Sequence, residues 1–93
     1  MMIVHPGRVL KREMEARGLS ANALALALRT PSGRITDIPN GKRGISPETA
    51  MRLGRYFGNS ARFWLNLQMG YELALAERDL GERISMEVSP AAA

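Results

Sequence analysis

The sequence predicts an all-α protein of five helices in one domain. Apolar residues recur at helical spacing in five segments, and serines, prolines or glycines bound each segment in the positions that caps and breakers favour. A chain of 93 residues fits one such domain. We assign residues 1–83 to that domain and residues 84–93 to a C-terminal tail.

The first helix is expected to begin at Pro6, because proline is tolerated in a first turn, where its missing N–H has no helical partner. Val9, Leu10 and Met14 then fall on one stripe. Gly18 marks the end of this helix.

Two short helices follow, joined by a tight turn. Ser20 is a suitable N-cap for a second helix that ends near Arg29. Thr30 and Pro31 predict the cap and first residue of a third helix that runs to about Ile38, where Pro39 stops it. Two helices and a turn of this length are the layout of a lambda-repressor-like helix-turn-helix DNA reader.

The last two helices are also marked by serine caps. Ser46 and Pro47 open a fourth helix, which Gly58 ends. Ser60 opens a long fifth helix that is expected to reach about Leu80. The alternating segment Ile84–Val88 predicts a short strand, after which the chain is expected to be disordered.

Composition excludes several function classes. The chain has no cysteine and one histidine, so disulfides, thiolate chemistry and the usual metal sites are not expected. No nucleophile with a base, paired carboxylates or phosphate loop is recognisable, so we expect neither an enzyme nor a cofactor. No membrane-spanning segment or signal peptide is recognisable, which predicts a cytoplasmic protein.

The net charge of +4 is unevenly distributed along the chain. Residues 1–59 contain ten basic and four acidic side chains, a balance of +6, whereas residues 60–93 contain three and five, a balance of −2. A polyanion is therefore expected to bind the first two thirds of the chain.

The third helix supplies the candidates for reading DNA bases. If Ile35 and Ile38 point inward, a step of about 100° per residue turns the polar side of this helix outward. That side carries Gly33, Thr36 and Asp37, with Ser32 and Arg34 on its flanks, and these five residues are expected to meet base edges.

Arg34 and Asp37 have two interpretations. The guanidinium is suited to a forked contact with guanine and the carboxylate to cytosine N4. Alternatively, the two side chains pair with each other on a solvated helix. Gly33 is unusual in a helix, and either it lets the helix backbone lie close to DNA or the helix begins later than predicted.

The candidates for binding the DNA backbone flank the third helix. They are Ser20, Asn22, Asn40, Lys42 and Arg43. Asn40 also has a structural explanation, because Asn40-Gly41 is a typical turn pair. Lys42 and Arg43 have no obvious acidic partner in the sequence.

The fifth helix carries more apolar surface than a small bundle needs. Trp64, Tyr71 and Leu75 are candidates for a dimer or partner surface, although aromatic residues at such spacing also commonly belong to a core.

Several segments together resemble HigA-type antitoxins, the virulence-associated-protein-I group of Xre/Cro-like helix-turn-helix proteins. The resemblance covers about residues 5–76, and its most specific part is NGKRGIS-P-ETA-RL-RYFG-S--FWLNLQ. Ala21 stands where the family commonly has glutamine, and Arg29 stands where it has a glycine in the inter-helix turn.

The resemblance implies a homodimer that binds double-stranded operator DNA, represses its own operon and neutralises a HigB-like ribonuclease toxin. Two other interpretations stay open: a stand-alone or phage-type repressor without a toxin, and an interaction domain that no longer binds DNA.

Overall fold

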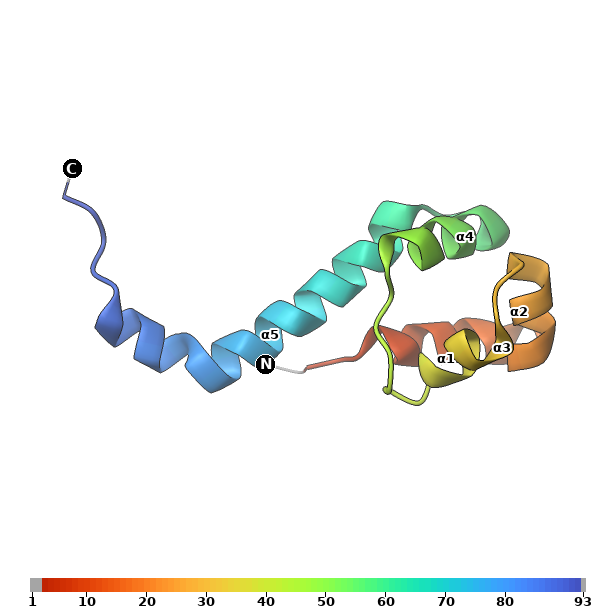
Figure 1. Cartoon of the computed structure of the whole chain (residues 1–93), viewed down its shortest axis with the longest axis horizontal. Helices are drawn as coiled ribbons and strands as arrows, with labels where there is room; N and C mark the ends of the chain where they lie inside the picture. Colours follow the sequence, from red (N-terminus) through yellow and green to blue (C-terminus); the bar gives the residue numbers. More distant parts are fainter. Residues whose placement is uncertain (1–2, 93) are drawn as a thin grey trace.

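Five helices make up the fold in the computed structural model, which describes residues 3–92, and these residues form no strand. The helices are α1 (Pro6–Ala16), α2 (Ala21–Leu28), α3 (Ser32–Asp37), α4 (Pro47–Phe57) and α5 (Ala61–Glu87). In Figure 1, α1 to α4 and the start of α5 gather into one globular part, and the rest of α5 extends away from it. The predicted all-α, five-helix architecture is confirmed.

Each helix contributes at least one fully buried side chain to the core. Leu10, Leu24, Ile35, Leu53 and Trp64 all have an exposed fraction of 0%. Burying a large apolar side chain contributes about 1.5 to 3 kcal/mol, so these residues account for much of the stability. The predicted inward orientation of the third helix is confirmed, since its flanking isoleucine at position 38 is also fully buried.

Side-chain caps begin four of the five helices. The hydroxyls of Ser20, Ser46 and Ser60 each accept a hydrogen bond from the backbone N–H three residues later, as predicted. At α1, His5 Nδ1 accepts from Gly7 N at 2.9 Å, which requires that this nitrogen be unprotonated. Burial lowers the pKa of His5, which favours the same neutral ring.

The start of α3 differs from the prediction. The helix begins at Ser32, its N-cap residue is Pro31, and no side chain caps it. The Thr30 hydroxyl is buried and lacks a hydrogen-bond partner in the structure. Thr30 does not cap α3, because its backbone closes the preceding helix instead: its N–H donates to Ala25 O at 3.0 Å.

The predicted strand at Ile84–Val88 is wrong. Helix α5 continues to Glu87, seven residues beyond the predicted end at Leu80, and crosses the predicted domain boundary after residue 83. A strand satisfies its backbone groups only beside another strand, and the described residues offer none. A helix satisfies them within the segment itself.

The turn between α2 and α3 contains a strained residue. Arg29 has φ 58° and ψ 46°, and it is the only non-glycine residue with positive φ among residues 3–92. This left-handed conformation costs a residue with a Cβ atom about 1 to 2 kcal/mol. We therefore expect Arg29→Gly to raise the free energy of unfolding by about 1 kcal/mol, measured by urea denaturation.

Arg29→Ala is the matched control, because it removes the charge and keeps the Cβ atom. An equal gain in both variants would show that charge, and not backbone strain, sets the cost at this position.

Candidate nucleic-acid interface

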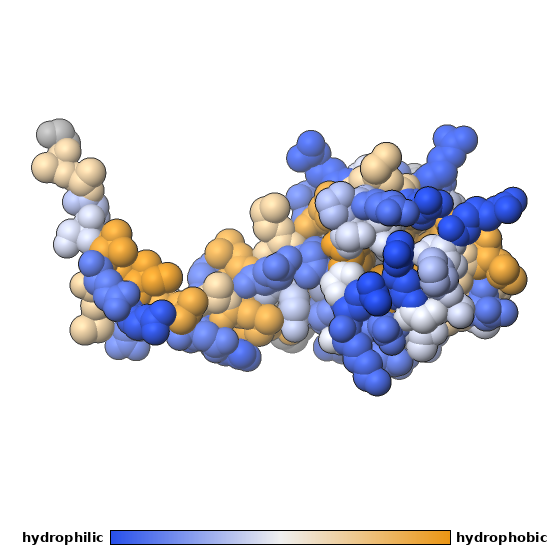
Figure 2. Space-filling view, viewed as in Figure 1, coloured by the Kyte–Doolittle hydropathy of each residue, from blue (hydrophilic) through white to orange (hydrophobic). Residues whose placement is uncertain are grey.

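Helix α3 presents a polar surface on the side away from the core. Ser32, Gly33 and Thr36 are exposed, while Ile35 is fully buried on the opposite side. This confirms the outward placement on which the base-reading assignment depends. In Figure 2, hydrophilic side chains cover most of the visible face of the globular part, and apolar atoms gather on α5 outside it.

Arg34 and Asp37 do not pair with each other, so that interpretation is wrong. Arg34 Nη1 lies 3.9 Å from Glu48 Oε2, and Asp37 Oδ2 lies 4.0 Å from Arg43 Nε. Both contacts are longer than a hydrogen bond and involve partly exposed side chains, so each is worth at most about 1 kcal/mol. Both α3 side chains can therefore leave these partners at little cost in free energy.

Thr36 and Gly33 differ in what the fold requires of them. Thr36 Oγ1 donates to Ser32 O at 3.0 Å, so the hydroxyl reaches a ligand only as an acceptor. A Cβ atom at Gly33 would meet no atom within 4 Å, and Gly33 does not have positive φ. Packing therefore does not require glycine there. Helix α3 begins at Ser32, one residue later than predicted, so Gly33 lies in the first turn and not in the interior of the helix.

The predicted backbone contacts lie on both sides of α3. Ser20 accepts from Ala23 N through Oγ and keeps its own hydroxyl hydrogen for an external acceptor. Asn22, Asn40 and Lys42 are exposed.

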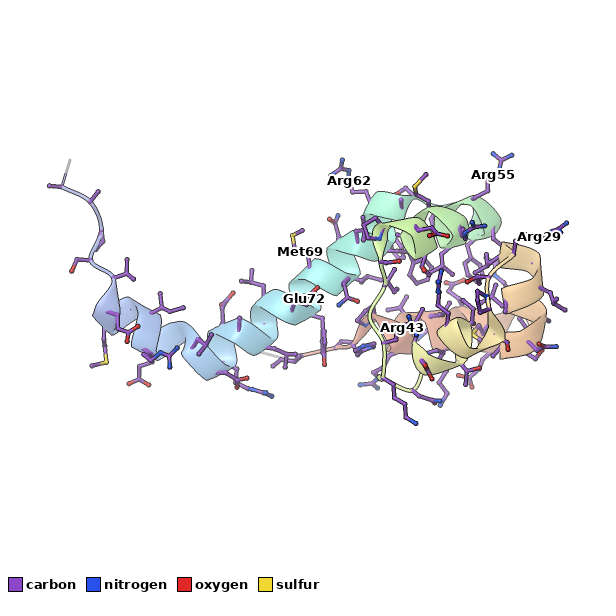
Figure 3. All side chains as sticks on the ribbon, viewed as in Figure 1. Arg29, Arg43, Arg55, Arg62, Met69 and Glu72 are labelled. Atoms are coloured by element: carbon purple, nitrogen blue, oxygen red, sulfur yellow. The ribbon has the colours of Figure 1, made fainter. Side chains whose placement is uncertain are left out.

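The loop between α3 and α4 carries Lys42 and Arg43, and Figure 3 shows Arg43 on this loop. Gly41 has φ 76°, which confirms the predicted tight turn. The expectation that Arg43 lacks an acidic partner is wrong, because folding brings it beside Asp37. The sequence offered no sign of this contact.

Gln68 is a positioning residue that the sequence analysis missed. Its Oε1 accepts a hydrogen bond from Ile45 N at 2.7 Å, which fastens the cationic loop to α5. Gln68 Nε2 donates to Glu72 Oε2 at 3.1 Å. A Cβ atom at Gly44 would lie 2.8 Å from Gln68 Nε2, so a side chain at position 44 would displace the amide of Gln68.

Replacing Gln68 with alanine is expected to lower the free energy of unfolding by about 1 to 3 kcal/mol, because the partly buried Ile45 N–H loses its acceptor. The amide of Ile45 should also exchange its hydrogen faster, measured by NMR. Glu72→Ala is the control, because it removes the partner of Gln68 Nε2 and keeps the Oε1 acceptor for Ile45. Unchanged exchange at Ile45 in Gln68→Ala would contradict the anchoring role.

The prediction that Trp64 belongs to a dimer or partner surface is wrong. Its side chain is fully buried, and Nε1 donates to Asn59 Oδ1 at 2.8 Å. Trp64 faces the core because α5 packs against α4 at this level, where its ring is 5.9 Å from that of Phe57. Tyr71 and Leu75 are half-buried, and the Tyr71 ring lies edge-on to His5 at 4.7 Å.

Residues 3–92 contain neither a membrane-spanning helix nor a cluster of metal-ligating side chains. No helix there is long and apolar enough to cross a bilayer. No group of three or more histidine, aspartate or glutamate side chains is placed to hold a metal ion.

Comparison with known proteins identifies the family of this chain. A helix-turn-helix family model matches residues 10–64. Virulence-associated protein I of Dichelobacter nodosus is 49% identical over 80 residues, which cover 85% of this chain and 74% of that protein. A HigA-family antidote protein from Coxiella burnetii is 42% identical, with a TM-score of 0.94 over 98% of this chain and 100% of that one. The chain belongs to the HigA-type antitoxins of the helix-turn-helix family.

One solved HigA antitoxin was determined together with nucleic acid. The Pseudomonas aeruginosa antitoxin HigA, solved with the higBA promoter, is 42% identical to this chain, with a TM-score of 0.94 over 98% of this chain and 100% of that one. The HigA-type fold thus extends through the whole of α5 and is not confined to the helix-turn-helix unit.

Proposed function

We propose that this HigA-type protein is a dimeric autorepressor and antitoxin, which reads its operator with α3 and neutralises a partner toxin. The exposed polar face of α3, flanked by a cationic loop, is the observation that carries the DNA-binding part. Ser32, Gly33, Arg34, Thr36 and Asp37 are the proposed base-reading residues. The proposed phosphate contacts are Ser20, Asn22, Asn40, Lys42 and Arg43.

The dimer surface that we propose is a stripe of α5. Met69, Leu73, Leu80 and Ile84 are all exposed, between 36% and 67%. At about 100° per residue they share one side of the helix with Ala76, opposite the side that carries Tyr71 and Leu75. Figure 3 shows Met69 directed away from α1. An exposed row of large apolar side chains indicates an interface.

The spacing of the stripe suits an antiparallel pair of α5 helices. Met69 and Ile84 lie equally far from the middle of the stripe, as do Leu73 and Leu80. Under two-fold symmetry each residue of a pair therefore meets the other in the second copy, as an isologous interface requires. The small Ala76 sits at the crossing, where the helices come closest.

A dimer of this kind presents two copies of α3 to one DNA duplex. The expected operator is a palindrome with half-sites about 34 Å apart, or a multiple of that distance. We also propose that the protein is cytoplasmic, because the operator that it binds lies on DNA in the cytoplasm.

The toxin part of the proposal rests on family membership and charge. Residues 60–93 have a charge balance of −2, whereas residues 1–59 have a balance of +6. We propose a HigB-like ribonuclease as the partner of this acidic portion. Type II toxins of that class act on RNA, so a basic toxin surface would complement it.

Co-expression with the product of the neighbouring gene tests the function directly. Native mass spectrometry is expected to detect a complex of both proteins, with and without a duplex from upstream of the operon. Operator binding without a toxin complex would identify a stand-alone repressor. Failure to bind any duplex would identify an interaction domain.

A further inference from the structure

Glu48 faces two arginines from different helices at the edge of the proposed DNA interface. Its Oε2 accepts a hydrogen bond from Arg52 Nε at 3.1 Å, and the same oxygen lies 3.9 Å from Arg34 Nη1. Arg52 belongs to α4 and Arg34 to α3. One carboxylate therefore links α3, the proposed reading helix, to α4.

Two features hold the Glu48 carboxylate in place. Arg52, which binds it, also donates through Nη1 to Leu28 O at 2.9 Å, at the C-terminal end of α2. Glu48 lies in the first turn of α4, where the helix dipole favours a negative charge. The hydrogen bond from Arg52 and the dipole of α4 thus both favour this position of the Glu48 carboxylate.

The contact with Arg34 is different, because it is long and replaceable. At 3.9 Å it is an ion pair without a hydrogen bond, and the side chains of Arg34 and Glu48 are 31% and 63% exposed. Arg34 can keep its orientation in the free protein and still move to another acceptor.

We infer that Glu48 is a specificity-determining residue, which holds Arg34 in position and penalises DNA that offers no better acceptor. This inference rests on the proposed reading of operator bases by α3. On DNA that lacks a suitable base, the Glu48 carboxylate holds Arg34 back from a nearby phosphate. A correctly placed guanine offsets the loss of the contact between Arg34 and Glu48, because its O6 and N7 atoms accept a forked pair of hydrogen bonds from Arg34.

Neutralising Glu48 should therefore improve binding to the wrong DNA more than to the right DNA. Glu48→Gln is expected to raise affinity for a scrambled duplex by about two- to fivefold, the range for an exposed ion pair. Affinity for the duplex from upstream of the operon should stay the same or fall. The ratio of the two affinities, measured by fluorescence anisotropy at fixed salt, should fall.

Two further variants separate this role from a simple change in charge. Glu13→Gln is the matched control, because Glu13 also faces an arginine four residues later, Arg17 at 3.5 Å, on α1. It should leave the affinity ratio unchanged. In an Arg34→Ala background, Glu48→Gln should no longer alter the ratio, because Glu48 acts through Arg34.

Thermal melting of each variant shows whether it folds. An equal gain on both duplexes, or an effect that persists without Arg34, would overturn the inference and leave Glu48 as a helix-dipole residue. If the wild-type protein itself fails to distinguish the two duplexes, the proposed operator reading fails instead.

Discussion

Replacing Leu73 with glutamate is expected to convert the proposed dimer to a monomer. Leu73 is 57% exposed in the single chain and lies near the centre of the proposed α5 stripe. In an antiparallel pair the symmetry buries the new carboxylate twice, and each unpaired buried charge costs about 3 to 5 kcal/mol. Analytical ultracentrifugation measures the change in mass.

The same variant should bind operator DNA at least about 100-fold more weakly. In a dimer, binding of one α3 holds the second α3 close to its half-site, and a monomer loses this gain in affinity. Circular dichroism should show unchanged helix content, since the Leu73 side chain is not part of the buried core. A Leu73→Glu protein that remains a dimer would contradict the proposed interface.

Two methionines provide a matched control for the dimer surface. Met69 on α5 and Met51 on α4 are 67% and 66% exposed. A glutamate at either position is therefore expected to have a similar effect on the stability of the single chain. Only Met69 belongs to the stripe. Met69→Glu is expected to weaken the dimer, whereas Met51→Glu should leave its mass unchanged. Equal weakening by both variants would point to a nonspecific effect of charge.

Removing the Arg34 side chain is expected to lower discrimination between operator and scrambled DNA by about 1 to 3 kcal/mol, a factor of roughly 5 to 150. The guanidinium is the one side chain on α3 able to make a forked contact with guanine. Its present partner, Glu48, is 3.9 Å away and is readily exchanged. Fluorescence anisotropy on both duplexes measures the change in Arg34→Ala.

Lys42→Ala is the comparison for Arg34→Ala. Lys42 is exposed on the loop after α3 and is proposed to contact a phosphate. Its loss should weaken binding to both duplexes equally and reduce the slope of log affinity against log salt by about one. If Arg34→Ala also weakens both duplexes equally, Arg34 contacts a phosphate and does not read a base.

Sequence reasoning succeeded where a local signal has a local physical cause. The serines at 20, 46 and 60 each cap a helix, because a hydroxyl reaches the N–H three residues later whatever the rest of the chain does. The helix stripes were equally reliable, and Ile35 is buried as its spacing predicts. The outward face of α3 follows directly from these two signals.

The structure differs from the prediction where one residue could serve either of two neighbouring helices, or where the partner of a side chain lies far along the chain. Thr30 resembles a cap for α3, but it completes the end of α2 instead. The alternation in Ile84–Val88 fits a strand, yet the segment has no neighbouring strand and stays helical to Glu87. Gln68 anchors Ile45 across 23 residues, a contact that leaves no trace in the local pattern.

The sequence by itself determined the five helices, the serine caps of three of them, the basic first two thirds and the residues that α3 turns outward, because propensity, capping and net charge act over a few residues. Tertiary structure decided the rest. It buried Trp64 against Asn59 and Phe57, left the other side of α5 uncovered, and brought Arg34 to Glu48. These outcomes depend on how the helices pack, which sets the neighbours of each side chain.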